Sequence, residues 1–380
     1  MKLIPSAAFL LIIAFFLKFS SASPGDDLEE FDACKFQCEE IVCFQSPAIY
    51  AMIGGFNPDW KFNGPPLLYL RLLQWSCADD CDYQCQRKVT SERKDAGEEV
   101  LQFHGKWPFI RVLGIQELAS TIFSCGNLLV HCIGIKKLLK ETISLDGKFR
   151  CQYTNVLLTS FITILAWTCS TIFHIRDVLI TERLDYFLAG LVVLMSFHLI
   201  GSRLFRLYHP KKRILKYAYS FGCLLAYCGH IYRLLTDWLY TYNMRANILC
   251  GILQNVCLYC LCFQLYYKYY QTESGETDDK VIRMNHLKYA KDKTLFSSFY
   301  TRSPKLYSLY PLLLSFIVTV GMSLEIFDFP PVFFDLIDAH SLWHLVTIFP
   351  AYYGWYEWMI WDINENVLPE LASIYKKKNN

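Results

Sequence analysis

The sequence predicts an all-α membrane protein: a seven-transmembrane helix bundle preceded by a small disulfide-rich lumenal segment. Three observations predict this class. Hydrophobic residues make up 53% of the 380 residues, seven apolar stretches are each long enough to cross a bilayer, and six cysteines cluster in a polar segment ahead of these stretches. The net charge of +2 gives no indication of a nucleic-acid partner.

Residues 1–22 have the pattern of a cleavable signal peptide. Lys2 precedes an apolar run from about Ala7 to Leu17, and small residues then lead to a predicted cleavage after Ala22. The run is shorter than the roughly 20 residues that a membrane span needs, although an uncleaved anchor is the alternative. We therefore expect the chain to enter the secretory pathway.

Residues 23–106 form a polar segment that we expect in the lumen. An even number of cysteines behind a signal peptide indicates disulfide bonds in an oxidising compartment. Many pairings are possible, so the sequence leaves the connectivity open, and a zinc-binding cysteine cluster is the competing interpretation. The cysteines fall in two groups of three: Cys34, Cys38 and Cys43, then Cys77, Cys81 and Cys85.

The predicted membrane domain covers residues 107–366. Loops rich in Lys and Arg stay in the cytosol, and such loops follow the first and third spans, whereas the loops after the second and sixth spans are balanced or acidic. This places the amino terminus in the lumen and the carboxyl terminus in the cytosol. The predicted spans are Phe109–Ile135, Val156–His174, Asp185–Ser202, Ile214–Leu235, Ala246–Tyr267, Tyr307–Ile326 and His340–Trp361.

Residues 367–380 are then a cytosolic tail. Its last four residues place Lys377 and Lys378 in the register of a dilysine signal, which coat proteins bind to return membrane proteins to the endoplasmic reticulum. A basic flank that only follows the positive-inside rule is the alternative. The pattern predicts residence in the endoplasmic reticulum, the Golgi apparatus or both.

Five polar residues are expected at the same membrane depth, at the lumenal ends of three spans. Ser170 and His174 lie four residues apart, hence on one helical face; Asp185 opens the third span; and His340 and His344 form a second pair with the same spacing. Ionisable residues are costly in a membrane and are functional candidates by default. The coincidence of depth is informative because the topology was assigned without any histidine.

Three neutral imidazoles with one open position form a ligand set of catalytic zinc. Zinc held by His174, His340 and His344 would lower the pKa of a bound water and polarise a carbonyl. Asp185 would orient that water or accept its proton, and Ser170 would bond the water or the developing oxyanion. Taken singly, His174 is equally compatible with a helix-end histidine bonded to a backbone carbonyl.

Other polar residues in the predicted spans are weaker candidates. We expect His131 and His198 to be packing or interface residues, while His230 lies close enough to the lumenal end to support the site. Gln116 and Glu117 would be costly in hydrocarbon, so we expect them to be paired within the bundle, or to bind a second cation or a polar headgroup.

The pattern Ser170-x-x-x-His174, Asp185 and His340-x-x-x-His344 resembles the signature of the CREST superfamily of membrane hydrolases. Within it, the chain is most similar to the Per-one-like family of glycosylphosphatidylinositol (GPI) lipid remodelling factors. Leu118 departs from the family pattern, in which a proline follows the Gln-Glu pair. The strings that carry the resemblance are Phe103-His104-Gly105-Lys106-Trp107-Pro108-Phe109, Gly114-Ile115-Gln116-Glu117, Asp328-Phe329-Pro330-Pro331 and Asp338-Ala339-His340-Ser341-Leu342-Trp343-His344.

The resemblance implies removal of the sn-2 fatty acid from the phosphatidylinositol of GPI-anchored proteins. It also implies that the three histidines bind the metal and that Ser170 and Asp185 handle the water and the oxyanion. The substrate rests on the resemblance alone. Two other functions stay open: a ceramidase-like amide hydrolase, in which a cysteine-rich lumenal segment would be unexpected, and a non-catalytic receptor or scaffold, which the loop charges disfavour if its site faces the cytosol.

Overall fold

The structure is a computed structural model that describes residues 23–45, 57–273 and 293–379. The predicted signal peptide, the Lys378 side chain and Asn380 lie outside this description. The described residues contain helices, turns and three isolated β-bridges, and no strands. The described residues divide into a smaller unit, which contains those up to 119 together with 174–177 and 328–339, and a larger helical unit.

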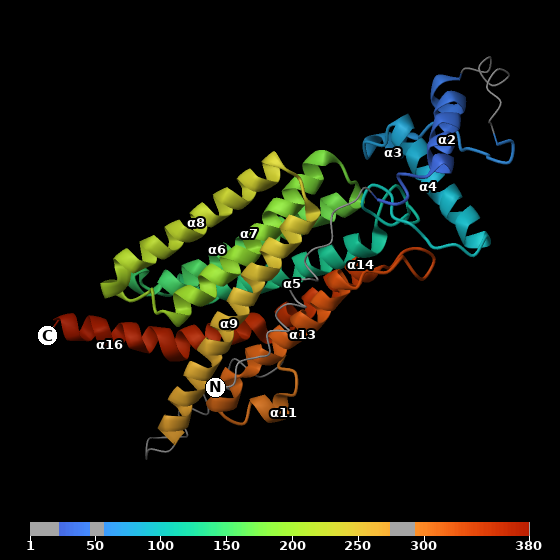
Figure 1. The fold of residues 1–380 in the computed structure, drawn as a ribbon. Helices are drawn as coiled ribbons and strands as arrows, with labels where there is room; N and C mark the ends of the chain where they lie inside the picture. Colours follow the sequence, from blue (N-terminus) through green and yellow to red (C-terminus); the bar gives the residue numbers. More distant parts are fainter. Residues whose placement is uncertain (1–22, 46–56, 274–292, 380) are drawn as a thin grey trace, which may run out of the picture. The chain divides into compact units, whose positions relative to one another are not determined.

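The smaller unit is built on helices α2 (Glu29–Cys38) and α4 (Cys77–Asp95), which pack together (Figure 1). A π-helical turn (Glu39–Phe44) extends α2, and a short helix, α3 (Leu68–Leu72), precedes α4. Both groups of cysteines are spaced by about one helical turn, so one face of each segment meets the other. The three disulfides are nested: Cys34–Cys85, Cys38–Cys81 and Cys43–Cys77.

This pairing confirms that the six cysteines form disulfides. Each disulfide typically contributes about 2–4 kcal/mol to stability, which suits a unit with a small core. That core combines disulfide-bonded cysteines with apolar side chains, which include Phe31, Val89 and Phe103, each 1% exposed.

The larger unit begins with three long helices, α5 (Leu118–Ile143), α6 (Cys151–Ile175) and α7 (Leu179–Leu204). Helix α7 packs against α8 (Arg213–Thr236) and α9 (Tyr240–Glu273), as Figure 1 shows. Two single turns of 3-10 helix, Gly147–Phe149 and Pro210–Lys212, precede α6 and α8.

The carboxyl-terminal part starts with α11 (Ser297–Tyr300), α12 (Pro304–Ser308) and α13 (Tyr310–Ile326). A nearly continuous helical run then extends to the tail. Its backbone leaves helical geometry at Tyr353 and at Gly354, where φ is 97°. The run comprises α14 (Ala339–Pro350), a π-helical segment (Ala351–Trp355), α15 (Tyr356–Asp362), a second π-helical segment (Ile363–Val367) and α16 (Leu368–Asn379).

Within the described residues, five helical segments are long and apolar enough to cross a membrane. They match five of the seven predicted spans, and the structure does not confirm the other two. Helix α8 is long enough but less apolar, because polar residues such as His230 interrupt it. Helix α14 has 12 residues, or about 18 Å at 1.5 Å per residue, which is shorter than a bilayer core.

The first predicted span starts too early. Phe109 was its expected start, but the helix begins at Leu118. Two tight turns precede it, closed by the bridges Phe103–Lys106 and Val112–Ile115. Each contains a glycine in the left-handed region, Gly105 with a φ of 79° and Gly114 with a φ of 85°. A hydropathy window does not detect such turns.

A buried ion pair lies in the core of the larger unit. Arg203, near the end of α7, donates from Nε and Nη2 to the two carboxylate oxygens of Asp362 over 2.6 and 2.8 Å. Their side chains are 4% and 0% exposed. The Asn366 amide also donates to Asp362 over 3.1 Å. The pair therefore fixes α15 to α7.

Candidate metal centre

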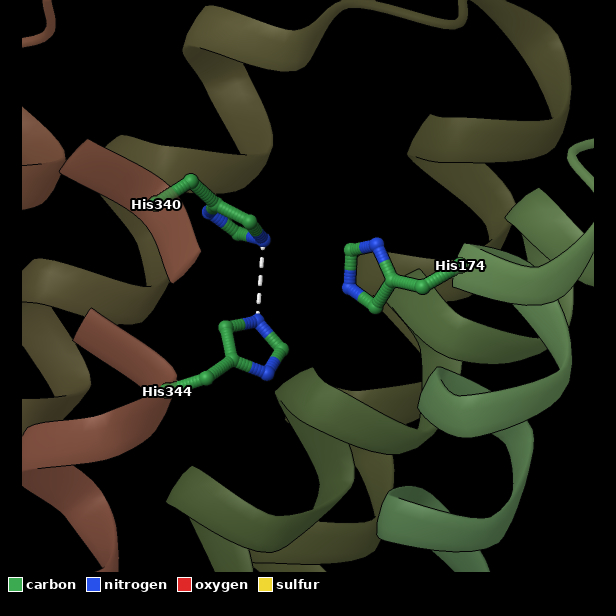
Figure 2. A group of neighbouring side chains, drawn as sticks. All are labelled: His174, His340 and His344. Atoms are coloured by element: carbon green, nitrogen blue, oxygen red, sulfur yellow. Dashed lines mark hydrogen bonds between the residues drawn. The ribbon is translucent and has the colours of Figure 1, made fainter. Parts of the chain in front are cut away.

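His340 and His344 come together because they lie one turn apart on α14. Their Nε2 atoms are 2.9 Å apart. His174 is in the last turn of α6, and Figure 2 shows its ring turned toward the other two. One nitrogen of each ring lies within 4.8 Å of the corresponding nitrogens of the other two, an arrangement that could hold a metal ion. The structure thus brings together the three predicted ligands.

Each of the three rings is also bonded through its Nδ1 atom. The Nδ1–H of His174 donates to Oε2 of Glu117 over 2.7 Å, and that of His340 donates to Oε2 of Glu325 over 2.8 Å. Nδ1 of His344 lies 2.9 Å from the Ser124 hydroxyl. An imidazole that donates from Nδ1 carries its lone pair on Nε2, and metal-binding histidines usually have such a partner on the nitrogen that does not bind the metal.

Glu117 is itself held by charge. Nζ of Lys106 donates to its Oε1 over 2.5 Å and pairs with Asp177 at 3.0 Å. Burial by itself would raise the pKa of Glu117, but the Lys106 ammonium and His174 outweigh burial and hold that pKa well below its usual range. Burial alone would lower the pKa of Lys106, and the Glu117 and Asp177 carboxylates raise it instead. Both groups are ionised at neutral pH.

The backbone reinforces this contact. The N–H groups of Gln116 and Glu117 donate to the carbonyls of Ile175 and His174, over 3.0 Å each. These carbonyls belong to the last turn of α6, where helices leave acceptors unsatisfied. Glu117 therefore bonds His174 through both its backbone and its side chain. Pairing, one of the alternatives that the sequence left open for Glu117, is observed, but at the residue directly ahead of α5 and not within the helix bundle.

Ser170 and Asp185 are placed differently from the histidines. Ser170 is 4% exposed, and its hydroxyl lies 3.2 Å from that of Ser124, the partner of His344. Asp185 lies in the second turn of α7. The group of ligand atoms within 4.8 Å, searched over the described residues, consists of the three histidines without Asp185.

Sequence reasoning missed two residues of the centre. Glu325 is an ionisable residue in the last turn of α13, inside a predicted span. Because ionisable residues are costly in a membrane, its position could have marked it as a functional candidate. Ser124 gave no such signal, because a serine in an apolar helix commonly bonds its own backbone. Its contact with His344 depends on tertiary packing.

The other membrane histidines have structural partners. His131 bonds the Tyr356 hydroxyl over 2.7 Å, and His198 bonds that of Ser220 over 2.9 Å. Both agree with the expected packing role. His230 lies 3.4 Å from the hydroxyl of Tyr242 on α9. The residues that bond the Nδ1 atoms of the three candidate ligands are Glu117, Glu325 and Ser124, and His230 is not among them.

The comparison with known families decides the relationship. The Per1-like family profile matches residues 67–363, which covers most of the chain and all the residues of the centre. The chain belongs to the Per1-like family. Protein PER1 of Saccharomyces cerevisiae is 40% identical over 354 residues, covering 90% of this chain and 91% of the relative.

Two animal relatives of this Per1-like chain carry more descriptive names. The GPI-specific phospholipase A2-like PGAP3 of Xenopus tropicalis is 33% identical, with coverage of 95% of this chain and 98% of the relative. Post-GPI attachment to proteins factor 3 of Drosophila melanogaster is 29% identical, with coverage of 90% of both chains. No solved structure matches this chain.

Proposed function

We propose that this Per1-like protein remodels GPI anchors by hydrolysing the sn-2 acyl ester of their phosphatidylinositol. The observation that carries this proposal is the convergence of three histidines, each oriented through Nδ1, in a chain whose relatives are named for GPI-specific phospholipase A2 and for action after GPI attachment. The substrates would be GPI-anchored proteins within the membrane.

The donor set fits a metal ion, and we infer zinc. Three imidazole nitrogens within 4.8 Å of one another, with Nδ1 of each engaged elsewhere, match the ligands of catalytic zinc. His174, His340 and His344 would hold it. A zinc ion bound there supplies a Lewis acid that activates water toward an ester carbonyl.

The remaining residues of the centre would handle protons and charge. In the proposed hydrolysis, water adds to the acyl carbon, the ester C–O bond breaks, and the products are a free fatty acid and a lyso-GPI lipid. Asp185 accepts the proton of the attacking water and returns it to the leaving oxygen of the glycerol. Ser170, whose hydroxyl lies 3.2 Å from that of Ser124, donates a hydrogen bond to the developing oxyanion.

The proposal includes the topology of the chain. Seven spans in residues 107–366 would place the three histidines at the lumenal side, behind a cleaved signal peptide (1–22) and a cysteine-rich lumenal segment (23–106). The cytosolic tail, 367–380, would present Lys377 and Lys378 to coat proteins and keep the enzyme in the endoplasmic reticulum and Golgi membranes. Glycosylation sites inserted into successive loops test each orientation.

Lipid analysis in cells tests the reaction. Cells that lack this chain would be rescued with the wild type, with His340→Ala or with His198→Ala, and the lipid of their GPI-anchored proteins measured by mass spectrometry. His198→Ala is a matched control because it removes a membrane histidine that bonds Ser220 instead of the centre.

We expect an unsaturated sn-2 chain to persist without rescue and with His340→Ala, and to be removed by the wild type and by His198→Ala. A normal lipid profile in cells that lack the chain would refute the GPI assignment. Full rescue by His340→Ala would refute the role of the histidines.

A further inference from the structure

Two motifs that precede the first long helix have no role in the hydrolysis described above. One contains Lys106, in the turn closed by Phe103 and Lys106, and the other contains Glu117, directly after the turn closed by Val112 and Ile115. These turns are sequence-distant from the histidines, and no part of the proposed reaction requires them. The structure nevertheless joins both to His174.

Lys106, Glu117 and His174 are connected in series, with the Glu117 carboxylate between the other two. Lys106 Nζ lies 2.5 Å from Glu117 Oε1, and the other oxygen of the same carboxylate, Oε2, accepts from His174 Nδ1 over 2.7 Å. The two carboxylate oxygens therefore have separate partners, one cation and one imidazole. Asp177, three residues after His174, binds Lys106 from another side at 3.0 Å.

The ion pair between Glu117 and Lys106 is expensive in desolvation because the Glu117 carboxylate is buried. The side chains of Glu117 and His174 are 4% and 1% exposed. A buried carboxylate carries a large desolvation penalty, which a single neighbour does not always offset. A histidine that only packs at a helix end would need one neutral acceptor, such as a carbonyl. A buried carboxylate, itself fixed by a cation, instead orients the ring and increases the basicity of its other nitrogen.

We propose that Glu117, held by Lys106, is a positioning residue that fixes the ring of His174 with Nε2 directed at the metal. This inference rests on the proposed function, which it deepens. The cation that holds Glu117, Lys106, is the last residue of the predicted cysteine-rich segment. Glu117 acts through His174 and touches no reacting atom in this account.

Metal affinity distinguishes positioning from simple stabilisation. The full-length protein would be purified in detergent, loaded with zinc and titrated with a chelator of known affinity, and the cobalt-substituted protein would be examined by absorption spectroscopy. The variants are Glu117→Ala, Glu117→Gln and Lys106→Met. Asp335→Asn is the matched control, because this lumenal carboxylate also bonds two cations, Arg87 and Lys94, without contacting a histidine.

We expect Glu117→Ala to raise the zinc Kd by about 10- to 100-fold, which is the usual effect of removing such a partner. Glu117→Gln should fall between Glu117→Ala and the wild type, since its amide oxygen still accepts from Nδ1 without the charge. Lys106→Met should weaken binding as well, and the cobalt spectrum should change in each. Asp335→Asn should stay within about twofold of the wild type.

Equal zinc affinity in the wild type and Glu117→Ala would overturn the inference and leave the proposed function intact. A wild type that binds no metal would overturn both. If Glu117→Ala fails to fold, the other two variants decide: an unchanged Kd in Glu117→Gln and Lys106→Met refutes positioning, and the predicted weakening supports it. A lowered unfolding temperature with an unchanged Kd would show that the ion pair is only structural.

Discussion

The buried ion pair between Arg203 and Asp362 should behave as a unit, so removing one member is more damaging than removing both. In Asp362→Leu the guanidinium of Arg203 stays buried, with its side chain 4% exposed, and loses both of its hydrogen bonds to the carboxylate. Breaking a buried pair in this way costs about 3–5 kcal/mol. Arg203→Met should cost a similar amount, since it leaves the Asp362 carboxylate uncompensated.

The double variant Arg203→Met/Asp362→Leu removes both charges together. If the two costs were independent they would sum to about 6–10 kcal/mol, whereas replacing both members by apolar side chains is often close to neutral. The Asn366 amide loses its acceptor, which adds about 1 kcal/mol. We therefore expect the double variant to be more stable than either single variant, with a coupling of several kcal/mol.

Reversible unfolding in mixed micelles measures this cycle, with the free energy of unfolding taken at one denaturant concentration for all four proteins. Single variants within about 1 kcal/mol of the wild type would refute the argument from burial. A double variant that costs the sum of the two would refute the coupling. The result bears on the centre, because Asp362 ends α15 and the same helical run begins with α14, which carries His340 and His344.

Three further predictions concern single substitutions. Ser124→Ala should raise the zinc Kd less than tenfold by chelator titration, because His344 loses a neutral partner instead of a carboxylate; a larger loss would give the serine a greater role. Gly134→Ala should lower the free energy of unfolding by about 1–3 kcal/mol, since the new methyl group would overlap the ring of Tyr356. An unchanged free energy of unfolding would show that this ring can move. His104→Gln should be less stable than the wild type mainly below the ordinary histidine pKa. The hydrogen bond to Asp82 is the main cause that raises the pKa of His104, so the stability that His104 contributes is fully present at low pH and is lost as the pH rises through the raised pKa. Melting curves that show the same loss of stability at pH 8 as at pH 5.5 would contradict this.

The three histidines could be predicted because local rules place them. A spacing of four residues sets His340 and His344 on one helical face, and loop charges assign the ends of α6 and α14 to the same side without reference to any histidine. The five matching spans follow from hydropathy in the same way. These signals depend on short segments, and no tertiary contact is needed to detect them.

The residues that support the centre depend on contacts between distant segments. Glu117 pairs with Lys106 and His174 because two glycine-containing turns shape the chain ahead of α5, and hydropathy alone extended the predicted span across the second of these turns. Ser124 meets His344 only once α5 and α14 are packed together. The disulfide connectivity likewise depended on the antiparallel contact of two segments, and the sequence left all pairings open.

The most direct test of the central claim is fatty acid release by the purified full-length protein from a GPI lipid with a labelled sn-2 chain. We predict release of the labelled fatty acid by the wild type, its loss after chelation, its recovery on adding zinc, and no release by His344→Ala at any zinc concentration. Release that survives chelation and the loss of His344 would contradict a metal-dependent hydrolase built on the three histidines.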